Sequence, residues 1–101
     1  MLKKAVIYLL LLTSLSGFAQ VGNLKSEADQ AYISEDYSKA TELYEQILSQ
    51  EYVSAEVHYN LGNAYFKTGN IAPAILHFER AKKLAPNDED IIFNLKLANL
   101  S

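Results

Sequence analysis

Apolar residues recur every three to four positions along most of the chain after residue 22, which is the spacing of one face of an α-helix. The pattern is clearest at Ile71, Ala74, Phe78 and Ala81, which are separated mainly by polar residues. Interruptions divide it into segments of helical length. The sequence therefore predicts an all-α chain with five helices, at about residues 23–34, 37–50, 54–67, 71–84 and 88–100.

The interruptions contain residues that end or begin helices. Residues 68–70 separate two predicted helices, and Gly69 can take the positive φ of a helix terminus. Residues 35–36 stand at the same place one helix pair earlier. Pro86 cannot continue a helix, and residues 87–88 offer Asn and Asp as caps for the next one.

The helices form an internal repeat with a period of 34 residues. A shift by this period superposes like residues, among them Ala40 on Ala74, Tyr44 on Phe78, Asn60 on Asn94 and Leu61 on Leu95. We predict a first, degenerate copy at residues 20–54 and a second copy at residues 55–88. The final helix, at residues 89–101, is either a cap or a truncated third copy.

The N-terminal segment has the pattern of an export signal. Its features are the basic pair Lys3 and Lys4, an unbroken apolar run over residues 5–12, and the small-x-small sequence Gly17-Phe18-Ala19. We predict a signal peptide at residues 1–19 and a chain exported to the periplasm. The alternative is an uncleaved segment that associates with the membrane, although the run is shorter than the roughly 20 residues needed to span it.

The composition and the motifs of the chain argue against several classes of site and partner. Without cysteine there is no disulfide, thiolate metal site or thiol nucleophile. The net charge of −3, with acids and bases interspersed, argues against nucleic acid as a partner. Nucleophile-elbow, phosphate-loop and HExxH motifs are missing. We predict no enzymatic activity, cofactor, metal or small-molecule substrate. His58 and His77 lie on different predicted helices, and we interpret His58, at a packing position, as a buried or half-buried structural residue rather than a ligand or base.

The second copy resembles the tetratricopeptide repeat. With Ala55 as its first residue, the matching positions are Leu61, Gly62, Tyr65, Ala74, Phe78, Ala81 and Pro86. His58 departs from the large apolar residue favoured at its position. The resemblance implies a short right-handed superhelical solenoid, with Gly62 and Ala74 where two helices cross closely. These are packing positions, so they predict a fold more than a function.

The chain after the signal peptide is also similar to BatE-like tetratricopeptide proteins of bacterial aerotolerance operons. The resemblance rests on residues 36–40, 59–67, 84–90 and 93–95. It implies a part in an envelope complex linked to oxidative stress. Members of that family usually continue into a membrane segment and an SH3-like domain, neither of which follows here, and whether the natural chain continues past Ser101 stays open.

In stacked repeats of this type, the first helix of each pair lines a concave face that binds peptides. The partner-binding candidates are Lys25, Asp29, Tyr32, Glu56, Tyr59, Asn60, Asn63, Phe66, Lys67, Asp90, Phe93, Asn94 and Leu97. The alternative is a solvated polar face with exposed aromatic residues. We do not expect a clamp for a terminal carboxylate, because Phe93 and Leu97 stand where that clamp needs basic residues.

The predicted function is therefore a non-enzymatic scaffold or adaptor that binds a protein partner in the cell envelope. The alternative is a structural subunit that forms a homodimer through the last helix. Leu95, Leu97 and Leu100 spread apolar surface along that helix, and the sequence supplies no following helix to cover it.

Overall fold

The computed structural model describes residues 20–101, and in this range every regular element is an α-helix. Residues 20–33 are helical, followed by α2 (Tyr37–Leu48), α3 (Ala55–Lys67), α4 (Ile71–Leu84) and α5 (Glu89–Asn99). The all-α helical-repeat fold is therefore confirmed. The predicted signal peptide at residues 1–19 lies outside the described residues.

Side-chain caps set where several of these helices begin. Asp36, Ser54 and Asp88 stand just before α2, α3 and α5, and each accepts hydrogen bonds from backbone N–H groups of the first turn. A capping oxygen satisfies donors that have no partner inside the helix. Ser54 and Asp88 are thus caps, so α3 and α5 start one residue later than their predicted ranges.

The turns inside the two helix pairs share a left-handed residue. Gly69, between α3 and α4, has φ of 80°, as predicted. Glu35, between the 20–33 helix and α2, has φ of 62°. Glycine adopts this region without a steric penalty, whereas a residue with a Cβ atom does not. The first turn therefore has the same shape as the second but carries backbone strain.

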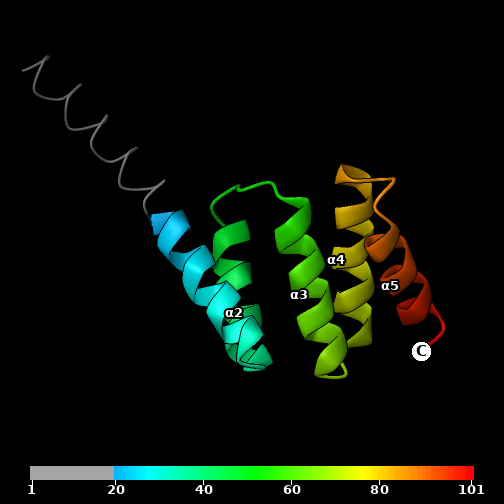
Figure 1. Ribbon diagram of the computed structural model, residues 1–101, viewed down its shortest axis with the longest axis horizontal. Helices are drawn as coiled ribbons and strands as arrows, with labels where there is room; N and C mark the ends of the chain where they lie inside the picture. The colour runs from blue at the N-terminus through cyan, green and yellow to red at the C-terminus, as the bar shows by residue number, and fades with distance from the viewer. Residues whose placement is uncertain (1–19) are drawn as a thin grey trace, which may run out of the picture.

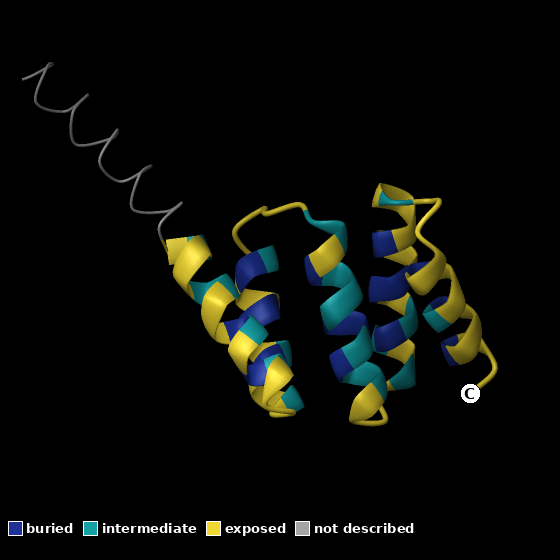
Figure 2. Ribbon diagram, in the orientation of Figure 1, coloured by how far each residue is buried: buried dark blue, intermediate teal, exposed yellow. Residues whose placement is uncertain are grey.

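Each helix packs against the next along the chain, so that α3 lies between α2 and α4, and α5 closes the C-terminal end (Figure 1). One apolar cluster joins the 20–33 helix, α2 and α3, and a second joins α4 and α5. Tyr65 packs against both clusters. Figure 2 shows the buried residues on the helix faces that meet their neighbours.

The close helix crossing predicted at Gly62 is present, and the group nearest to it is an aromatic ring. A Cβ atom at Gly62 would lie 2.7 Å from Cδ1 and Cε1 of Phe78, which is 1% exposed. The Phe78 ring therefore lies directly against Gly62. The absence of a side chain there is what lets α3 and α4 approach.

The last helix exposes less of its apolar surface than the sequence suggests. Leu95 is buried with Ile91 and Ala98, in the face that packs on the preceding helix. Leu97 and Leu100 remain 44% and 79% exposed. The expectation that Leu95 shares in an open apolar surface is therefore wrong, because the rotation of α5 turns it toward α4. Among the helices of residues 20–101, none is long and apolar enough to cross a membrane.

Candidate binding face and a histidine pair

The predicted concave-face residues of the first two helix pairs are linked by charge. Lys25 lies on the 20–33 helix. Its Nζ atom is 2.8 Å from Asp29 Oδ2, one turn later, and 3.2 Å from Glu56 Oε1 on α3. Its hydrogen bond with Asp29 raises the pKa of Lys25 above its ordinary value. The Lys25 ammonium group therefore bridges two first helices of the repeat and leaves this end of the face with excess negative charge.

Tyr44, which is not among the predicted residues of this face, reaches it from α2. The hydroxyl of Tyr44 donates to Asp29 Oδ1 at 2.6 Å and accepts from the amide of Asn60 at 3.3 Å. Burial is the main cause that raises the pKa of Tyr44, and the bond to the Asp29 carboxylate raises it further. Tyr44 stays protonated and holds Asp29 and Asn60 in place. Its match with Phe78 in the repeat had indicated packing only.

A second set of bonds joins α3 to α5. The amide nitrogen of Asn94 donates to the Tyr59 hydroxyl at 3.0 Å and to Asn63 Oδ1 at 2.8 Å. Both amide protons of Asn94 are therefore used inside the protein. The asparagines of this face orient one another, so a partner would meet a surface that is already ordered.

Next to this network is a small pocket of about 140 Å³ between α3 and α5. Its walls are the predicted residues Asn63, Phe66, Lys67, Asn94 and Leu97, together with Phe78 of α4. It combines an apolar floor with amide groups and a lysine. Two other candidates do not line it: Phe93 is 65% exposed on α5, and Tyr32 packs edge-on against Tyr37 with ring centroids 5.8 Å apart.

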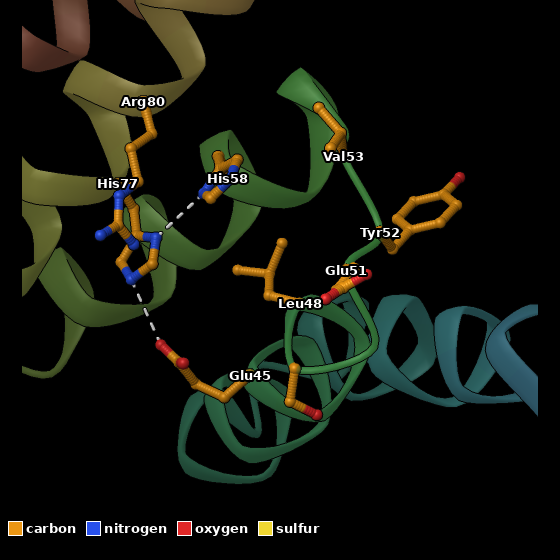
Figure 3. Close-up of a pocket in the computed structure, with 9 residues that line it drawn as sticks. Glu45, Leu48, Glu51, Tyr52, Val53, His58, His77 and Arg80 are labelled. Carbon is orange, nitrogen blue, oxygen red and sulfur yellow. Dashed lines mark hydrogen bonds and ion pairs between the residues drawn. The ribbon is translucent and has the colours of Figure 1, made fainter.

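The structure also brings together two histidines that are 19 residues apart in the sequence. His58 Nδ1 of α3 lies 3.0 Å from His77 Nδ1 of α4, and His77 Nε2 lies 3.2 Å from Glu45 Oε1 of α2 (Figure 3). Tyr65 donates its hydroxyl to the same Glu45 oxygen at 3.0 Å. The cluster thus ties α2 of the first copy to α3 and α4 of the second copy.

These contacts fix where the protons lie. A carboxylate can only accept, so His77 donates from Nε2 to Glu45, and its Nδ1 is the acceptor for Nδ1–H of His58. Burial is the first cause that lowers the pKa of both imidazoles, and the positive charge of Arg80 lowers both further. Glu45 opposes this effect at His77. Both rings are neutral at neutral pH.

Sequence comparison within the chain carries a signal for this pair. A shift of 34 residues places Leu24 on His58 and Leu43 on His77, so two leucines of the first copy are replaced by two histidines in the second. Leu43 is buried in the first apolar cluster, and Leu24 packs against it. Because both positions change from Leu to His together, the alignment of the two copies could have indicated that the two histidines are in contact. Within residues 20–101, no group of three or more His, Asp or Glu side chains is arranged to hold a metal ion.

Comparison with known proteins bears on the same stretch of chain. Residues 55–88 match the family model of the tetratricopeptide repeat. The chain carries a tetratricopeptide repeat. Over 69 residues it is 30% identical to a protein named Protein SGT1 homolog from Oryza sativa subsp. japonica, a match that covers 68% of this chain but 19% of that protein. The finer likeness to BatE-like proteins rests on the sequence pattern alone.

Proposed function

We propose that this chain is an adaptor that binds an extended segment of a protein partner across the face formed by the 20–33 helix, α3 and α5. Tetratricopeptide repeats are in general protein-interaction modules, and one occupies residues 55–88. The single observation that carries the proposal is the pocket of about 140 Å³ beside the ordered asparagine network. An enzymatic role is not proposed.

The composition of the pocket suggests how a partner would bind. An apolar side chain would bury its surface against Phe66, Phe78 and Leu97, which line the pocket. Lys67 at its wall would favour an acidic residue next to that anchor. At the other end of the face, Asp29 and Glu56 share the single positive charge of Lys25, so a basic residue fits better there. The partner segment would therefore run with opposite charges at its two ends.

The cellular setting of the proposal rests on the sequence. The export pattern of residues 1–19 supports a place in the bacterial cell envelope, most simply the periplasm. The similarity to BatE-like proteins supports a role in an aerotolerance-linked complex. Both parts of the proposal concern where the adaptor works, and neither is needed for partner binding at the face.

The alternative proposal is a subunit that associates with a second copy of itself. It is favoured by one observation, the exposure of Leu97 and Leu100 on α5. Exposed apolar side chains on a helix of a repeat array form a surface suited to packing against another helix. A homodimer through α5 would cover both leucines and leave the 20–33 helix free.

A crosslinking experiment separates the two proposals. A photoreactive amino acid would replace Lys67, at the pocket, in the full chain expressed in cells, and in a matched control it would replace Lys82, an exposed lysine of α4. We expect one envelope protein to be captured from position 67 and not from position 82. Capture of the chain's own copy would favour the homodimer, and equal capture at both positions would contradict the adaptor proposal.

A further inference from the structure

The bond between His58 and His77 depends on a single shared proton. The two ring centroids are 5.3 Å apart, and the planes are inclined by 21°. With Nδ1 atoms only 3.0 Å apart, the nitrogens lie between the rings and point at one another. An N–H···N bond of this kind forms when one Nδ1 is protonated and the other is not. If both carry protons, no acceptor remains.

Charged and titratable groups surround the pair from every packed element. Glu45 of α2 accepts the Nε2 proton of His77, and the ring of Tyr65 of α3 lies over His77 with centroids 5.8 Å apart. Arg80 stands one turn after His77 on α4. An open pocket of about 490 Å³ is bordered by both histidines, Glu45 and Arg80, but not by Tyr65. Glu51, in the segment before α3, borders it as well. Water can therefore deliver protons to the pair.

We propose that the His58–His77 pair is a pH-sensitive contact that holds α3 and α4 together when both rings are neutral and releases them when the rings become protonated. Protonation of both rings would remove the acceptor and place two positive charges 3.0 Å apart, beside Arg80. Glu45 can balance only one of them. The contact between the helices then becomes repulsive.

The direction of the pH effect follows from burial. The pKa of each histidine is lowered in the folded chain from its ordinary value of 6.5. Below that value the unfolded or opened chain takes up protons more readily than the closed chain. The stabilisation from this contact is therefore fully present above pH 6.5 and is lost as the pH falls through the folded pKa values.

Opening of this contact would reach the binding face. Phe78, which follows His77 on α4, lies against Gly62 and forms part of the floor of the small pocket. Movement of α4 away from α3 would move the Phe78 ring and change the shape of that pocket. Acidification would then weaken any complex formed there, but the opening itself needs no partner.

The test uses the isotope-labelled full chain and NMR without a partner. Long-range proton–nitrogen correlations should show His58 protonated at Nδ1 and His77 at Nε2, with both rings titrating below their ordinary pKa. Between about pH 8 and about pH 5, amide exchange in α3 and α4, corrected for its intrinsic pH dependence, should speed up more than exchange in α2. Two rings that titrate near 6.5, or protection in α3 and α4 that does not change over this range, would overturn the proposal.

A matched variant shows whether the histidines cause the effect. His58→Leu combined with His77→Leu restores the leucine pair of the first copy, Leu24 and Leu43. We expect the acid-induced opening to disappear in this variant. If the same opening persists, the carboxylates and not the histidines cause it, and the proposal is wrong. Should the variant fail to fold, the wild-type titration still decides.

Discussion

The two copies of the repeat meet the same packing requirement with different pairs of residues. In the second copy, Gly62 makes room for the ring of Phe78, which lies flat against it. In the first copy the same positions hold Ala28 and Tyr44, both fully buried. The methyl group fits there, and the Tyr44 hydroxyl extends to Asp29. Residues at a helix crossing thus work as matched pairs, so a match at one position predicts little without its partner.

The copies also differ at a second pair of equivalent positions. The first copy uses Leu24 and Leu43 in an apolar cluster, while the second uses His58 and His77 in a hydrogen bond. Leucine packing does not depend on pH, whereas a histidine pair loses its N–H···N bond when both rings are protonated. On this proposal the second copy is pH-sensitive at a site where the first copy is not.

The largest expected effect comes from disturbing the Gly62 pairing. Gly62→Ala would place a Cβ atom 2.7 Å from the buried Phe78 ring. We expect a loss of about 2–3 kcal/mol in the free energy of unfolding, since an overfilled crossing forces the helices apart. Urea denaturation followed by circular dichroism measures this.

The control for Gly62→Ala is the reverse change in the first copy. Ala28→Gly should cost only about 0.5–1 kcal/mol, chiefly through the greater freedom of the unfolded chain. If Gly62→Ala costs no more than this, the two crossings are equally spacious and the matched-pair interpretation fails.

A smaller effect is expected from making Tyr44 resemble its counterpart. Tyr44→Phe removes the donor to Asp29 Oδ1 and the acceptor for Asn60. We expect a loss of about 1 kcal/mol, because Asp29 is partly exposed and water can replace part of the lost bond. Thermal unfolding monitored by circular dichroism would show it. If the variant is as stable as the wild type, the contribution of Tyr44 to stability comes from its aromatic ring alone, as it does for Phe78.

The smallest effect is a gain at the first turn. Glu35→Gly relieves a left-handed residue with φ of 62°, but it also increases the freedom of the unfolded chain. We expect a net increase of about 0.5 kcal/mol in stability. Gly69→Ala, at φ of 80° in the other turn, should lower stability by about 1 kcal/mol. Opposite signs in paired denaturation curves are the expected result, and equal signs would contradict it.

Much of the fold was predictable because its signals are local. The apolar period, the left-handed Gly69 and the cap residues depend on geometry within one or two turns of a helix, which neighbouring residues determine. The predicted helices accordingly agree with the structure to within a few residues at each end. The candidate face was predicted less completely, since Phe93 lies outside the pocket and Tyr44 joins the network from a second helix.

The sequence by itself determined an all-α chain with a repeat of 34 residues and a glycine where two helices must approach. Only the tertiary structure decided that His58 meets His77, and that Leu95 is buried while Leu97 is exposed. The reason is physical. Periodicity identifies the apolar side of a helix, but the rotation of each helix about its axis is set by the side chains of its neighbours. Which residues touch across an interface therefore depends on all the packed helices together.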